Sequence, residues 1–352
     1  MSHRHLVAGR RHALIHAMPV LVGGLSLLLI VLMLVAVGVG SVPIPLDTVW
    51  GVIASKVAPG SVSVDWSSGR ENIVWEVRAP RIVLGAAVGA LLALVGAALQ
   101  AVTRNPLADP HLLGVSSGAA FGAITALMQT GMVLGIATVP LFSFAGALAA
   151  TAMVLSVANL AQAQSAGRLV LAGVAVGFII TAAGNLLIFL GDPRATHTVV
   201  FWMLGGLGLA QWSHLPYPLA ALAGGAIYLI ANARQLNVMT LGDESATALG
   251  VPAERFRLTV FVIAALMTGC AVAFSGVIAF VGLMIPHVVR LAVGGDYRRV
   301  LPLSALAGAI FLVAADMAAR TVVAPQDMPL GILTGLIGGA GFIVLLRRRS
   351  TN

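Results

Sequence analysis

Long apolar runs separated by short polar segments are the main pattern of the chain. A run needs about 20 residues to cross a bilayer as a helix, and ten runs approach that length. They lie at residues 17–40, 80–102, 112–130, 134–160, 168–190, 213–232, 256–275, 277–293, 301–320 and 330–346. The pattern predicts ten membrane-spanning helices. The more polar residues 41–77 are expected to form a loop with short interfacial helices.

Composition excludes the water-soluble classes of protein. Of the 352 residues, 59% are hydrophobic and 9% are charged, and the mean hydropathy is +1.01. A soluble domain is about 45–50% apolar and about 25% charged, so this chain could not cover itself with polar surface in water. Cys270 is the only cysteine, which excludes an internal disulfide. We therefore expect an all-α integral membrane protein, a polytopic bundle that forms one domain over residues 1–352.

Basic residues indicate the orientation of the predicted helices. The 20 Lys and Arg outnumber the 12 Asp and Glu, but they stand singly or in threes between apolar runs, which argues against nucleic-acid binding. With ten helices both termini lie on one side, which then holds 14 of the basic residues. The other side holds the remaining six: Lys56, Arg70, Arg78, Arg81, Arg194 and Arg320. By the positive-inside rule, both termini are expected in the cytoplasm.

The chain carries few groups that could do chemistry. A Walker A loop needs a lysine after a glycine-rich turn, and the only lysine, Lys56, lacks that context. Zinc-protease and serine-hydrolase motifs are also missing from the sequence. Asp316 is the one carboxylate well inside an apolar run, where burial is costly without a partner. Since Arg320 follows four residues later, we expect an ion pair between successive helical turns.

Five motifs occur in a fixed order along the chain. They read RAPR at 78–81, QAVTRNPLA at 100–108, LGDESATALG at 241–250, PHVVR at 286–290 and MPLG at 328–331. From about residue 20 to 347 the chain resembles the permease subunits of ABC importers for iron chelates, haem and cobalamin, the FecCD type of type II importer. The resemblance implies ten spans per subunit, a homodimer with a central pathway, two cytoplasmic ATPase subunits and one periplasmic binding protein. It also implies a multi-pass protein of the bacterial inner membrane.

The stretch 237–252 lies in the longest predicted cytoplasmic loop. Its acidic residues follow a Leu-Gly pair, which predicts a short amphipathic helix with acids in its first turn. The resemblance implies that this helix couples the membrane helices to the ATPase, which would itself bind ATP and Mg, while this chain binds no cofactor or metal. The coupling residues would be Leu241, Gly242, Asp243, Glu244, Ala246, Leu249 and Gly250. The alternative is an ordinary solvated loop helix.

Three arginines fall at the predicted periplasmic ends of spans: Arg78, Arg81 and Arg320. An arginine in such a position is usually exposed and anchors the helix at the membrane interface. The resemblance implies a second role, in which the three guanidinium groups dock carboxylates of the binding protein. A guanidinium fork suits two-point recognition of a carboxylate.

The resemblance also assigns a cytoplasmic gate and a translocation path. The gate would be formed by Ser165, Ala166 and Gly167, although relatives carry hydroxyl side chains where this chain has Ala166 and Gly167. The path would be lined by His197, Trp202 and Met203. His and Met side chains are able to ligate haem iron, but an importer must release its cargo, which disfavours strong ligation along the path.

Together these features predict an importer permease that moves haem or a ferric siderophore into the cytoplasm by ATP-driven alternating access. A cobalamin importer permease is the alternative. An ion-coupled secondary transporter would carry several ionisable groups at mid-membrane, and Asp316 is the one candidate. An intramembrane enzyme is disfavoured because no set of nucleophile and base is found.

Overall fold

The computed structural model describes residues 2–160 and 166–349, in which the regular secondary structure consists of helices joined by turns and loops. The first half contains α1 (Ser2–Gly38), α2 (Leu46–Val57), α3 (Ser68–Asn72), η1 (Ile73–Arg78), α4 (Ala79–Thr103), η2 (Pro110–Leu113), α5 (Val115–Thr125), η3 (Ala126–Thr130), η4 (Gly135–Ala137) and α6 (Thr138–Leu160). The second half contains α7 (Ala166–Leu190), α8 (Pro193–Met203), η5 (Trp212–His214), α9 (Pro216–Ala231), α10 (Ala233–Met239), α11 (Asp243–Ala248), α12 (Ala253–Ser275), α13 (Val281–Val293), α14 (Tyr297–Ala319) and α15 (Leu330–Arg349).

Each predicted span overlaps helical structure, but not every span is one continuous helix, and the helices differ in length. Among the described residues, seven helical segments are long and apolar enough to cross a membrane, in α1, α4, α6, α7, α9, α12 and α14. Two more apolar segments are shorter, α13 and the first part of α15. The predicted span 112–130 is divided into η2, α5 and η3. Short helices are present within 41–77, as predicted: α2 and α3.

Helix α4 forms the centre of the bundle. It packs against α14, α12, α13 and α9, and nearly all of its side chains are buried. Glycines allow its backbone to touch its neighbours: a Cβ on Gly89 would collide with the Gly308 carbonyl of α14, and one on Gly96 with the Gly282 carbonyl of α13. Such close backbone contact stabilises helix pairs in membranes.

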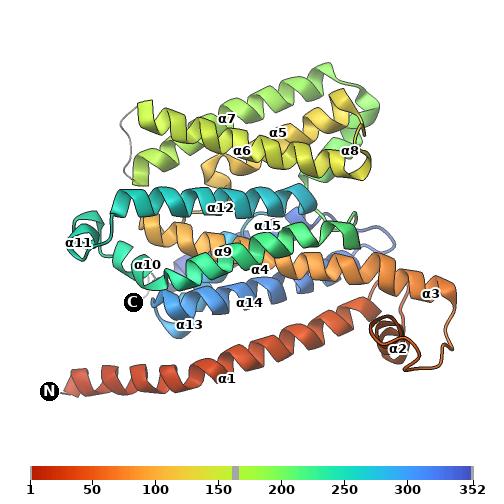
Figure 1. Cartoon of the computed structure of the whole chain (residues 1–352), viewed down its shortest axis with the longest axis horizontal. Coiled ribbons are helices and arrows are strands. Elements are labelled where there is room, and N and C mark those ends of the chain that lie inside the picture. The colour runs from red at the N-terminus through yellow and green to blue at the C-terminus, as the bar shows by residue number, and fades with distance from the viewer. Residues whose placement is uncertain (1, 161–165, 350–352) are drawn as a thin grey trace.

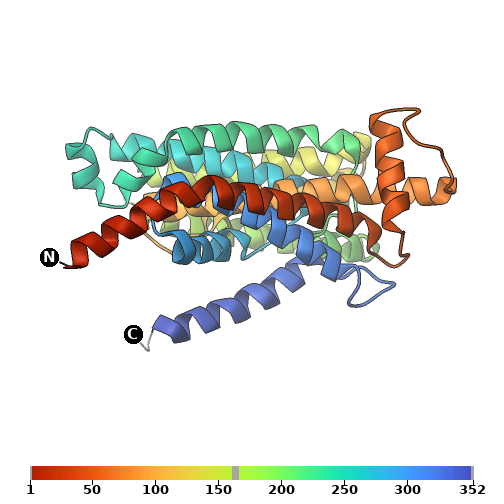
Figure 2. The ribbon, with the colours of Figure 1, turned by 90° about the horizontal axis from the view of Figure 1, so that it is seen from below.

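The remaining helices lie on either side of this centre (Figure 1). Helices α5, α6 and α7 pack together as one group, and α1 runs along the opposite flank against α14. The start of α1 and the end of α15 lie at the same end of the bundle as α10 and α11, as Figures 1 and 2 both show. The structure thus has one end with both chain termini and α11, and an opposite end formed by α2, α3 and the loop after α14.

Candidate functional site

Helices α10 and α11 form a short projection at the end of the bundle that carries the termini (Figure 1). They are joined at Gly242, whose φ of +109° is strained for any residue with a side chain. The site residues Asp243 and Glu244 occupy the first turn of α11, as predicted. Acidic side chains are favoured there because the helix dipole is positive at its N-terminus.

Asp243 ties this projection to two membrane helices. Its Oδ1 accepts a hydrogen bond of 2.5 Å from Nη2 of Arg257 in α12, and Nη2 of Arg104, at the end of α4, lies 3.7 Å away. Arg257 is only 2% exposed, and its Nε donates to the Val102 carbonyl of α4 at 3.2 Å. The Asp243 carboxylate therefore links the first turn of α11 to α12 directly and, through Arg257, to α4.

Two large apolar side chains are exposed on the projection, among polar residues such as Glu244 and Thr247. Leu241 and Leu249 are 63% and 62% exposed, although both are large aliphatic side chains. Ala246 is completely buried, so it is part of the core and not of this surface. Gly250 follows α11 with a φ of +83° and open space around it. Two of the seven predicted coupling residues thus offer apolar surface to a partner, and the others shape or hold the helix.

A second link at this end joins α10 to α14 through Asn237. Its Nδ2 donates to Oδ1 of Asp296 at 2.8 Å, and its Oδ1 accepts from the backbone N–H of Tyr297, also at 2.8 Å. The Arg298 guanidinium beside Asp296 holds the pKa of that carboxyl well below its usual range. Asp296 therefore stays ionised at physiological pH and accepts the hydrogen bond from Asn237.

Gln100 connects two of the motifs identified in the sequence. Its Oε1 accepts a 2.6 Å hydrogen bond from Arg290, and its Nε2 donates to the backbone carbonyls of Ala108 and Gly282 at 3.3 and 3.1 Å. Sequence reasoning did not identify this contact. Both residues stand inside quoted motifs, but they are 190 positions apart, and neither motif indicates its partner.

The three predicted docking arginines lie together at the opposite end of the molecule. Asp316 accepts from Nε of Arg320 at 3.0 Å, which confirms the expected ion pair between successive turns. It also accepts from Nε of Arg81 at 2.9 Å, and Nη1 of Arg81 contacts Asp327 at 2.5 Å. One buried carboxylate therefore holds two guanidinium groups, one from α4 and one from the end of α14.

Arg78 and Arg320 also bind the C-terminal turn of α1. Arg78 donates to the carbonyls of Val37, Gly38 and Val42 at 2.6–3.1 Å. Arg320 donates to the carbonyls of Ala36 and Val39 at 3.0 and 2.7 Å. These carbonyls are among the groups that a helix end leaves unsatisfied.

The three arginines were expected to be exposed, but the structure shows that they are buried. Arg78, Arg81 and Arg320 are 5–7% exposed, and their donors are already occupied by carbonyl and carboxylate groups. The physical reason is that the end of α1 and the loop after α14 fold over them. Asp327, whose side chain is 44% exposed, is the most accessible of their partners.

The predicted gate is only partly described. Ser165 lies outside the described residues, and Ala166 is the first residue of α7. Gly167 follows in the first turn of α7 with open space beside its Cα.

The predicted path residues lie on α8 but face different surroundings. His197 is exposed, and Trp202 and Met203 are half-buried. Met203 borders a cavity of about 180 Å³ between α5 and α7, whereas Trp202 borders a separate cavity of about 140 Å³. The structure therefore does not bring the three together at one site.

The cavity beside Met203 contains polar groups that the sequence did not suggest. It is lined by the hydroxyls of Ser116, Ser117 and Thr181, together with His111. Nε2 of His111 and Oγ of Ser116 are buried without a hydrogen-bond partner. The hydroxyls of Thr181 and Ser117 are hydrogen-bonded to each other at 3.2 Å.

Comparison with known proteins identifies the family. The profile of the FecCD transport family matches residues 28–348. The hemin transport system permease protein HmuU of Yersinia pestis is 37% identical over 81% of this chain and 87% of its own length. The cobalamin import system permease protein BtuC of Halobacterium salinarum is 40% identical over 79% and 74%. A solved structure described as a metal-chelate type ABC transporter in an inward-facing conformation superposes with a TM-score of 0.81 at 30% identity, covering 94% of this chain and 99% of that one. This multi-pass inner-membrane chain belongs to the FecCD transport family, whose members are permeases of ABC transporters.

Proposed function

We propose that the chain is the permease subunit of a binding-protein-dependent importer that moves haem or a ferric siderophore into the cytoplasm by ATP-driven alternating access. In the working transporter two copies would form a homodimer of ten spans each, with both termini cytoplasmic. Two cytoplasmic ATPase subunits and one periplasmic binding protein would complete it. Cobalamin is the alternative cargo, since similar relatives are named for hemin and for cobalamin.

One observation supports this proposal most strongly: Leu241 and Leu249 are exposed on either side of α11, a helix that is fixed to the membrane bundle. Exposed leucines on a short element at the end of a bundle favour contact with another protein. The attachment through Asp243 would pass a movement of that partner on to α4 and α12. We assign the ATP chemistry, with its Mg, to the ATPase partner, because the only lysine of this chain has no Walker A context.

An ion-coupled secondary transporter is disfavoured by the pairing of Asp316. This carboxylate accepts hydrogen bonds from two guanidinium groups, those of Arg81 and Arg320. Both of its oxygens are therefore engaged in structural hydrogen bonds within the bundle, whereas an ion-coupled transporter is expected to carry several ionisable groups at mid-membrane.

The remaining site assignments are part of the same proposal. Ser165, Ala166 and Gly167 would form the cytoplasmic gate, and α8 with His197, Trp202 and Met203 would border the path. The end that holds Arg78, Arg81 and Arg320 would receive the binding protein, with Asp327 as the contact that an incoming carboxylate displaces.

The test is ATP-driven uptake in proteoliposomes that contain this chain, its ATPase and its binding protein. Haem, a ferric hydroxamate siderophore and cobalamin are offered separately, and an ATPase with its Walker A lysine replaced serves as the control. We expect uptake of haem or the siderophore that the control complex lacks. Uptake of cobalamin alone would select the alternative cargo, and uptake that persists in the control complex would refute the proposed energy source.

A further inference from the structure

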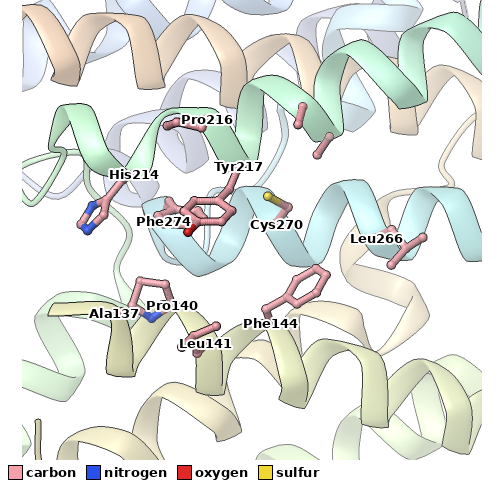
Figure 3. A pocket seen from close by; sticks show the side chains of 12 residues that line it. Ala137, Pro140, Leu141, Phe144, His214, Pro216, Tyr217, Leu266, Cys270 and Phe274 are labelled. Atoms are coloured by element: carbon pink, nitrogen blue, oxygen red, sulfur yellow. The ribbon is translucent and has the colours of Figure 1, made fainter. Parts of the chain in front are cut away.

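A deep apolar cleft opens between α6, α9 and α12 (Figure 3). Its volume of about 550 Å³ lies within the range of ~300–1,000 Å³ usual for small-molecule sites. Tyr217 stacks on Phe274 along one wall, with the ring centroids 5.7 Å apart. Leu141 and Phe144 of α6 form the facing wall, and Leu266 lies at the far end from His214.

The cleft follows the direction of the membrane helices from one bilayer surface inward. Helices α6 and α9 begin, and α12 ends, at the end of the bundle opposite α11 (Figure 1). Trp212 and Trp75, with ring centroids 4.7 Å apart, lie at the starts of α9 and α4. Such aromatic residues are typical of the level of the lipid headgroups, so the His214 end is at the bilayer surface and Leu266 lies deeper.

His214 supplies a polar group at the bilayer end of the cleft. Its side chain lines the cleft, and its Nε2 is buried and has no hydrogen-bond partner. The same side chain borders a second cavity of about 140 Å³, which also contains Gln211. A buried nitrogen without a partner is costly, and a ligand with a hydroxyl or ammonium group would satisfy it.

From this geometry we propose that the cleft binds one phospholipid of the surrounding leaflet. One acyl chain lies along Phe274, Cys270 and Leu266, and the headgroup or glycerol region hydrogen-bonds Nε2 of His214. Water is a poor occupant because the apolar walls offer it no hydrogen bonds. The lipid fits because the cleft is apolar along its length and polar at the one end that meets the headgroups.

The test uses the full chain purified in a mild detergent and mixed with palmitoyl-oleoyl phosphatidylethanolamine, with bound lipid counted by native mass spectrometry. Ala220→Trp fills the cleft from α9, and Ala223→Trp adds the same ring to an exposed position of α9 outside it. We expect one tightly held lipid per wild-type chain, about tenfold weaker retention in Ala220→Trp, equivalent to ~1.4 kcal/mol, and normal retention in Ala223→Trp.

A second variant tests the polar end separately. His214→Leu replaces the imidazole ring with an apolar side chain of moderate size and so removes the nitrogen. Lipid retention should then fall several-fold, while the purified chain remains monodisperse. Equal retention by wild type, Ala220→Trp and His214→Leu would overturn the proposal. So would a wild-type chain without bound lipid whose self-association is lost in Ala220→Trp, because the cleft would then be an interface between two copies.

Discussion

At the scale of single residues, Asp316 shows that a carboxylate in a membrane helix needs charged partners close by. A carboxylate in a spanning helix is tolerated when it is paired, and this one is paired twice, with Arg320 one turn away and with Arg81 in α4. Each guanidinium is in turn buried and holds further groups. Removing the Asp316 charge would therefore take an ionic partner from two buried guanidinium groups.

We therefore expect Asp316→Asn to destabilise the protein markedly. Removing one member of a buried ion pair costs ~3–5 kcal/mol, because the remaining charge stays buried without compensation. The thermal unfolding midpoint of the purified chain should fall clearly below that of wild type. Asp65→Asn, which changes an exposed carboxylate, is the matched control and should leave the midpoint unchanged. A wild-type midpoint for Asp316→Asn would show that the network adds little stability.

Only the local half of this network could be predicted from the sequence. The spacing of Asp316 and Arg320 implies contact whenever the segment is helical. Arg81 lies 235 positions before Asp316, and no pattern in either segment indicates that α4 and α14 lie side by side. The burial of Arg78 was missed for the same reason, since it depends on where the end of α1 comes to rest.

At the scale of elements, apolar runs predicted helices well where no backbone break intervened. The expected span 80–102 is observed as α4 over Ala79–Thr103. The expected span 277–293 begins only at Val281, because Gly276 and Phe280 both have positive φ and hold the chain out of the helix. Gly114, with a φ of +73°, likewise separates η2 from α5. Such breaks depend on backbone dihedrals that hydropathy does not report.

Helix α11 provides a prediction at this scale. Leu241→Glu and Leu249→Glu should each remove the ATPase from the purified complex, because a carboxylate would replace exposed apolar surface that the proposed partner covers. Co-purification with a tagged ATPase measures this directly. Leu46→Glu, at an exposed leucine of α2 at the other end of the molecule, should have no effect. ATPase recovery equal to wild type in both α11 variants would refute the assignment.

At the scale of the whole molecule, the bundle depends on direct backbone contact between α4 and its neighbours. The sequence showed that glycine is frequent, but the pairing of Gly89 with Gly308 and of Gly96 with Gly282 depends on the three-dimensional order of the helices. Hydropathy indicates which segments enter the membrane, and it does not determine which of them becomes the centre. That position follows from small residues along α4 that allow close approach on several sides.

Gly89→Ala should accordingly lower stability, although alanine is the better helix former. Its methyl group would overlap the Gly308 carbonyl, so α4 and α14 would have to separate. Gly224→Ala in α9 is the matched control, since the added methyl meets nothing within 4 Å and should be neutral or stabilising by up to ~1 kcal/mol. Thermal unfolding of the two variants side by side is the measurement. Equal midpoints would show that the helix pair adapts without cost.

The attachment of Asp243 has a mechanical consequence for the whole bundle. A force on Leu241 or Leu249 reaches Arg257 through one carboxylate, and Arg257 is also bonded to the backbone of α4. If the proposed ATPase moves this projection, these contacts offer a route by which the movement would reach α4, the most deeply buried helix, as well as α12.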